Sequence, residues 1–116
     1  MDVVGFGRLL CRLAFLGGVI AVLIGSLTPA TEMPDIGVSD KIQHFGAYAA
    51  LAFTAALGWP RGPMFGVVIA GVVVAGPAIE VLQMMVPGRS ASWGDVVADL
   101  VGVAIGLALA RVTQPI

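Results

Sequence analysis

The polar side chains that could do chemistry are gathered in three short stretches of the sequence. Within each stretch they lie three or four positions apart, the spacing that puts side chains on one face of a helix. The set contains the one histidine of the chain and four carboxylates. The candidate residues are Asp40, Lys41, His44 and Tyr48, then Glu80 and Gln83 with Arg89 and Ser90 beyond them, and finally Asp95 and Asp99.

These residue types fit two chemistries. Lys41 and Arg89, together with His44, have the charge and the donors to bind a phosphate or carboxylate headgroup. Alternatively, His44 beside a carboxylate is a candidate general acid and base, as in a membrane-embedded lipid phosphatase or transferase. Because the residues alone do not choose between binding and turnover, we assign no catalytic residue.

Metal binding and nucleophilic catalysis have less support. A hard metal could use Glu80, Asp95 and Asp99, but no linear ligand motif such as H-E-x-x-H is present, so we expect no metal and no cofactor. Ser90 and Ser92 belong to a predicted turn and helix start, so neither is assigned as a nucleophile.

The composition is that of a membrane protein. Of 116 residues, 59% are apolar and 11% are charged, against about 25% charged in a soluble domain. The mean hydropathy is +1.02. These values exclude an ordinary soluble enzyme, and a net charge of −1 excludes nucleic acid as a partner. Cys11 is the single cysteine, which excludes an intramolecular disulfide.

Four segments are long and apolar enough to cross a bilayer, which takes about 20 residues. A leader that is cleaved after the first apolar run is disfavoured, because Pro29 falls inside the would-be cleavage site. The connectors are short, so neighbouring spans should run antiparallel. We predict an all-α bundle of four transmembrane helices in one domain, 1–116, with spans at Leu9–Leu27, Asp40–Leu57, Met64–Val86 and Trp93–Ala110.

Local signals support these spans. Ser39 is a good cap for the second span, and Ser92 or Ser90 for the fourth. Pro77 should kink the third span. Gly102 and Gly106 form a G-x-x-x-G face for close helix packing, and this face could bind a partner helix in a larger membrane complex.

The basic residues predict the orientation. With the N-terminus in the cytoplasm, four arginines lie on the cytoplasmic side and two basic residues on the other. The cytoplasmic set is Arg8, Arg12, Arg61 and Arg111, and the opposite set is Lys41 and Arg89. We therefore expect both termini to be cytoplasmic and the polar site to face the extracytoplasmic leaflet.

Antiparallel packing brings the three polar stretches to one face of the membrane. At about 1.5 Å per residue, Glu80 lies roughly 9 Å inside its span. A carboxylate in the membrane costs about 2–3 kcal/mol even on lenient scales, so such residues normally face a bundle interior and pair with one another. The sequence therefore predicts a shared polar cavity at one end of the bundle.

Plainer roles remain open for several of these residues. Asp40 could act only as an N-terminal cap of its helix, and Tyr48 could be an aromatic side chain packed in the core. Glu80 and Arg89 could form a structural ion pair. We favour a functional role, in which Arg89 folds back over the Pro87-Gly88 turn and bridges Glu80 to Asp95, leaving one edge for an anion.

The same residues carry a family resemblance. The run from Asp40 to Leu51 resembles the D-K-x-x-H-x-x-x-Y-x-x-L element of the VanZ-like family. The residues from Glu80 to Gly106 resemble its second element, which reads E-x-x-Q, P-G-R and D-x-x-x-N-x-x-G-x-x-x-G. Asp99 departs from it, because the family usually has asparagine there.

The resemblance implies a small multi-span protein of the bacterial cytoplasmic membrane. The namesake of the family is associated with low-level resistance to teicoplanin, and the family offers no catalytic residue to carry over. Combining the resemblance with the residues, we expect a protein that handles an anionic lipid or a cell-envelope precursor at its headgroup. The alternatives are the membrane enzyme and the structural partner named above.

Overall fold

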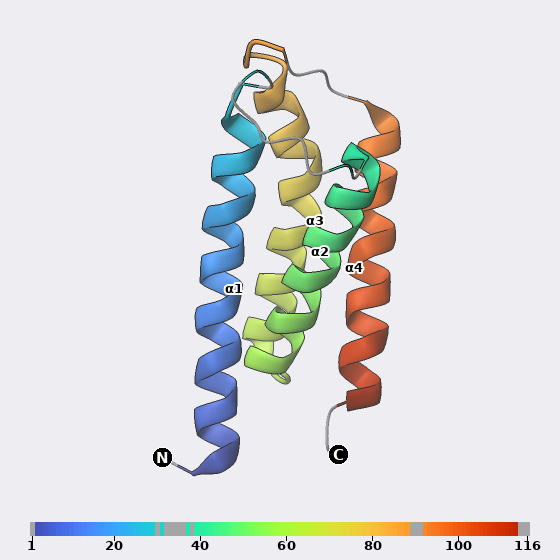
Figure 1. Ribbon diagram of the computed structural model, residues 1–116. Coiled ribbons are helices and arrows are strands. Elements are labelled where there is room, and N and C mark those ends of the chain that lie inside the picture. The colour runs from blue at the N-terminus through green and yellow to red at the C-terminus, as the bar shows by residue number, and fades with distance from the viewer. Residues whose placement is uncertain (1, 30, 32–36, 38, 89–91, 114–116) are drawn as a thin grey trace.

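The protein is a bundle of four helices. The computed structural model describes residues 2–29, 31, 37, 39–88 and 92–113. Consecutive helices run antiparallel, so α1 begins and α4 ends at the same end of the bundle (Figure 1). The prediction of an all-α, four-helix fold is confirmed. The helices are α1 (Val3–Leu27), α2 (Asp40–Gly58), α3 (Pro63–Gln83) and α4 (Trp93–Thr113).

Several predicted helix ends differ from the structure, and the fourth helix, for example, ends at Thr113 rather than Ala110. The first helix begins at Val3 rather than Leu9, because Asp2 caps it by accepting a hydrogen bond from the Gly5 amide at 2.7 Å. The third ends at Gln83 rather than Val86, since the chain passes there into turns that lead to Gly88 with φ 76°. The predicted start of α2 is confirmed, and the Ile42 amide donates to the Ser39 side chain at 3.3 Å.

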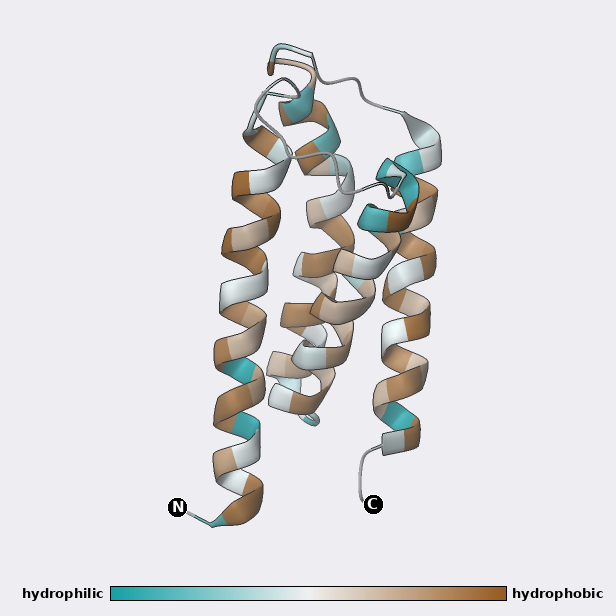
Figure 2. Ribbon diagram, viewed as in Figure 1, coloured by the Kyte–Doolittle hydropathy of each residue, from teal (hydrophilic) through white to brown (hydrophobic). Residues whose placement is uncertain are grey.

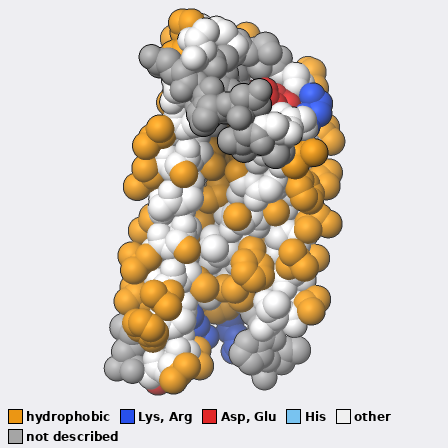
Figure 3. All heavy atoms as spheres, in the orientation of Figure 1, with side chains coloured by type: hydrophobic (Ala, Val, Ile, Leu, Met, Phe, Trp, Pro, Cys, Tyr) orange, Lys and Arg blue, Asp and Glu red, His pale blue; other side chains and the backbone are white. Residues whose placement is uncertain are grey.

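Three of the four helices, α1, α3 and α4, are long and apolar enough to span a membrane. Hydrophobic residues cover the middle of the bundle, and the hydrophilic ones gather toward its ends (Figures 2 and 3). The bundle is 46 Å long, more than the roughly 30 Å of a bilayer core. The chain is therefore a membrane protein. For α2, which starts with Asp40 and Lys41, and for the cytoplasmic location of the termini, the membrane topology stays a prediction.

Helix α2 packs closely against α4 because two glycines remove the side chains between them. A Cβ added at Gly102 or Gly106 would collide with the backbone oxygen of Phe45 or Ala49, respectively. Both glycines are buried. The G-x-x-x-G face therefore makes the predicted close packing inside this chain, where α2 covers it.

Helix α1 is the peripheral member of the bundle. None of its residues is buried, although Phe15, Val19 and Val22 pack against the core around Tyr48 and Leu51. At the end opposite the polar site, Arg12 Nε donates to the Gly58 carbonyl at 2.8 Å. This bond holds α1 against the end of α2.

Candidate functional site

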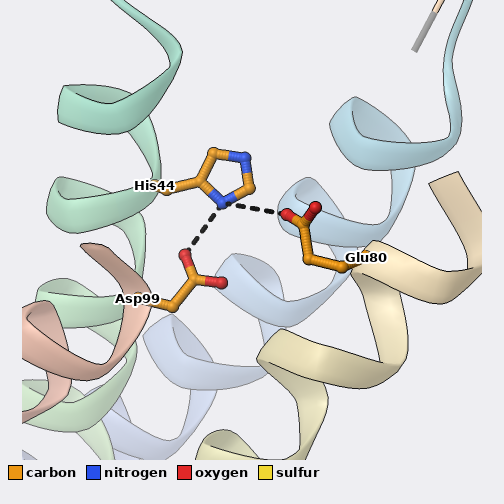
Figure 4. A group of neighbouring side chains, drawn as sticks. All are labelled: His44, Glu80 and Asp99. Carbon is orange, nitrogen blue, oxygen red and sulfur yellow. Dashed lines mark hydrogen bonds and ion pairs between the residues drawn. The ribbon is translucent and has the colours of Figure 1, made fainter. Parts of the chain in front are cut away.

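The three polar stretches meet at one end of the bundle, as predicted. His44 on α2, Glu80 on α3 and Asp99 on α4 point toward one another (Figure 4). His44 Nδ1 lies 2.8 Å from Asp99 Oδ1 and 3.9 Å from Glu80 Oε1. We call these three residues the His44 cluster.

The carboxylates of this cluster are held away from solvent. Glu80 is 4% exposed and Asp99 is 2% exposed. Gly76 lets α3 approach Asp99, because a Cβ there would lie 3.0 Å from Asp99 Oδ2. Within the described residues, Glu80 Oε1 and Asp99 Oδ2 are buried without a hydrogen-bond partner. Such atoms are costly to bury, so we expect a proton, a ligand or another side chain to satisfy them.

Ser92 connects the start of α4 to the cluster. Its backbone amide donates to Glu80 Oε2 at 3.1 Å, and its hydroxyl accepts from the Asp95 amide at 3.1 Å. The predicted cap at Ser92 is thus confirmed, and the same residue also positions Glu80. This second contact could not be predicted, because a backbone amide has no residue-type signature.

Lys41 and Asp95 form a separate pair. Lys41 Nζ lies 3.6 Å from Asp95 Oδ1, with the lysine side chain 63% exposed and the aspartate side chain 10% exposed. The lysine lies over Gly94, where a Cβ would come within 2.7 Å of its Cε. Lys41 therefore faces α4.

Comparison with known sequence families shows the family to which the chain belongs. The VanZ/LLP1 family model matches residues 19–114, a range that contains all ten candidate residues. The chain belongs to the VanZ/LLP1 family. The resemblance inferred from the motifs is thereby confirmed. No curated protein and no solved structure gives a significant match.

The VanZ/LLP1 chain has a pocket beside the His44 cluster. It has a volume of about 340 Å³ and lies between α1, α2 and α3. Its polar lining comes from Ser26, Asp40, Gln43, His44, Tyr48 and Gln83. We call it the polar pocket. It was not predicted in this form, because no motif pointed to α1 or to Ser26.

The remaining candidates fall into different places in the VanZ/LLP1 chain. Tyr48 is 2% exposed and belongs to the hydrophobic core, while also lining the polar pocket. Gln83 Nε2 donates to the Ser26 carbonyl at 3.1 Å, which ties α3 to α1. Asp40 is exposed in the first turn of α2. Arg89 and Ser90 lie outside the described residues, so the predicted Arg89 bridge stays a prediction.

Proposed function

We propose that the protein binds the headgroup of a membrane lipid or a lipid-linked cell-envelope precursor in the polar pocket. The observation that carries the proposal is that this pocket adjoins an apolar one deeper in the bundle. The second pocket, about 320 Å³, lies between the same three helices and has Val22 and Tyr48 in common with the first. We call it the apolar groove.

Together the two cavities match the shape of an amphiphile. The polar pocket offers hydroxyl, amide, imidazole and carboxylate groups to a headgroup, while the apolar groove offers Val19, Leu51 and Val72 to a hydrocarbon chain. Ligand sites are commonly apolar cavities with a few polar groups that fix orientation. Access from the membrane is favoured because α1, which forms one wall, has no buried residue.

The anionic character of the headgroup is the finer part of the proposal. We propose that Lys41 and Arg89 contact the anion, because both are cations suited to binding phosphate or carboxylate. Because Lys41 faces Asp95 on α4, we give Arg89 the larger role.

A link to teicoplanin resistance is proposed on the family resemblance alone. The test compares the teicoplanin susceptibility of a bacterial host with and without the protein.

Binding to purified protein tests the main proposal. The probes are short-chain phosphatidylglycerol, short-chain phosphatidylcholine and undecaprenyl phosphate, each titrated in detergent. Ala21→Phe narrows the polar pocket and Gly71→Phe narrows the apolar groove, since these residues line them. We expect each variant to weaken binding of the preferred probe by at least about tenfold, one decade in Kd.

Matched controls keep this test specific. Ala14→Phe and Val74→Phe place the same side chain on α1 and α3 at exposed positions, and should bind like the wild type. Unchanged binding by both cavity variants, or no saturable binding of any probe, would overturn the proposal. Preference for phosphatidylcholine over both anionic probes would contradict only the anionic part.

A second candidate function is a membrane enzyme, favoured by the His44–Asp99 contact at 2.8 Å. A histidine oriented by a buried carboxylate is the usual arrangement for proton transfer. Release of phosphate from a labelled polyprenyl phosphate by the purified wild type, lost in His44→Gln, supports turnover. Saturable binding without release supports the binding function.

A further inference from the structure

The His44 cluster carries more negative than positive charge. Glu80, Asp95 and Asp99 are all buried, and among the described residues Lys41 pairs with Asp95. In the part of the chain that the structure describes, Glu80 and Asp99 then have His44 as their one cationic neighbour within 4 Å. Burying carboxylates without compensation is strongly unfavourable, so a positive charge at this position would stabilise the fold.

The spacing of the ligand atoms in the cluster suits a metal ion. His44, Glu80 and Asp99 each offer one ligand atom, and these atoms lie within 4.8 Å of one another. Ligands about 2.1 Å from a tetrahedral metal are separated by about 3.4 Å. The distances from His44 Nδ1, 2.8 Å to Asp99 and 3.9 Å to Glu80, fall on either side of that value.

Two unpartnered atoms supply an independent sign of a ligand. Glu80 Oε1 and Asp99 Oδ2 are buried and lack a hydrogen-bond partner among the described residues. The labelled side chains converge on a common point from three different helices (Figure 4). A charged imidazole can donate from Nδ1 to one carboxylate at a time, whereas a metal ion can bind an oxygen of each.

We propose that His44 Nδ1, Glu80 and Asp99 bind one divalent transition-metal ion. One imidazole and two carboxylates form a mixed nitrogen and oxygen set, which suits Zn²⁺ or Mn²⁺. The expectation of no metal came from the absence of a linear ligand motif, and three ligands from three helices leave no such motif. The set is assembled only by the packing of α2, α3 and α4.

Three protein ligands leave a coordination position open for a further ligand. His44 also lines the polar pocket, so the open position adjoins the cavity proposed for a headgroup. A phosphate oxygen entering that pocket could complete the coordination. This last step rests on the proposed function, whereas metal binding itself does not.

Metal binding to the lipid-free, chelator-treated chain tests the proposal. Isothermal titration with Zn²⁺ and Mn²⁺, with metal content after gel filtration as a second readout, should give one ion per chain for at least one metal. Glu80→Gln and Asp99→Asn keep the side-chain shape and should weaken metal binding by at least about tenfold. Even substitution of residues that only hydrogen-bond to the metal ligands typically lowers metal affinity by this factor.

Asp95→Asn is the matched control, because Asp95 is a buried carboxylate at the same end but outside the cluster. It should bind metal within about twofold of the wild type. Where a cluster variant does not fold, the wild type supplies the test: the metal should raise its Tm, and Asp95→Asn should show the same rise. The metal site would be overturned if neither metal binds stoichiometrically. It would also be overturned if Asp95→Asn loses as much metal affinity as Glu80→Gln and Asp99→Asn. Lipid binding in chelator is measured separately, so failure here leaves the headgroup proposal standing.

Discussion

His44 Nδ1 lies 2.8 Å from Asp99 Oδ1, although the two residues are 55 positions apart in the chain. This contact joins α2 to α4 at the polar end of the bundle. It is buried on the aspartate side, where the side chain is 3% exposed. The contact is therefore part of both the site and the fold.

We expect His44 and Asp99 to be energetically coupled. A double-mutant cycle with His44→Ala and Asp99→Ala should give a coupling of about 1.5–3 kcal/mol, the range for hydrogen bonds to charged groups. The measurement is unfolding in detergent with chelator present. His44→Ala combined with Thr113→Val at the opposite end of α4 should be additive. Additivity in the His44–Asp99 cycle as well would contradict the coupling.

The glycine contact between α2 and α4 predicts a stability difference between two glycines. Gly106→Ala should destabilise the bundle by about 1–3 kcal/mol, because its new Cβ would collide with the backbone oxygen of Ala49. Gly71→Ala is the control, since nothing lies within 4 Å of a Cβ there. It should be neutral or stabilising by up to about 1 kcal/mol. Equal melting temperatures for the two variants would contradict the close packing of α2 against α4 at Gly106.

For Arg89, the prediction rests on the sequence. Arg89→Lys keeps the charge but loses the planar fork, so we expect it to lose most binding of an anionic probe while still folding. Glu80→Gln should also lose binding, because it removes the charge that positions the arginine. It should still fold, because its amide oxygen can accept from the Ser92 amide. Thermal melting in detergent measures the folding of each variant, and titration with the anionic probe measures its binding.

The competing role for these two residues gives a different pattern. If Glu80 and Arg89 form only a structural ion pair, both variants should lose stability together by about 3–5 kcal/mol. An Arg89→Lys variant that melts and binds like the wild type would reject the anion contact.

The predicted topology is tested by reporter fusions. With both termini in the cytoplasm, the turn between α2 and α3 at residues 58–63 should report a cytoplasmic location, and a fusion near Gly88 should report the opposite side. The arginine bias carries this expectation. A reporter at 58–63 found outside would invert the orientation and leave the three stretches together at one end.

Much of the fold followed from the sequence, because apolar length and short connectors suffice to predict four antiparallel helices. The meeting of His44, Glu80 and Asp99 also followed, since buried charges in neighbouring spans must share an interior. What could not be predicted depends on contacts without a residue-type signature. The Ser92 amide on Glu80 and the Ser26 carbonyl on Gln83 are backbone groups. The start of α1 was missed because the predicted span was begun at Leu9, just after Arg8, whereas the helix extends back to its cap at Asp2.

The origin of the cluster in three helices bears on how the chain enters the membrane during synthesis. His44 emerges before Glu80, and Glu80 emerges before the two residues that complete its surroundings, Ser92 at the cap of α4 and Asp99 within α4. A lone α3 would carry Glu80 into lipid at a cost of about 2–3 kcal/mol. Insertion of α3 and α4 together as a helical hairpin against α2 avoids that cost, because Glu80 then has the Ser92 amide as a donor and Asp99 has His44. The residues that form the site thus also favour a particular order of membrane insertion.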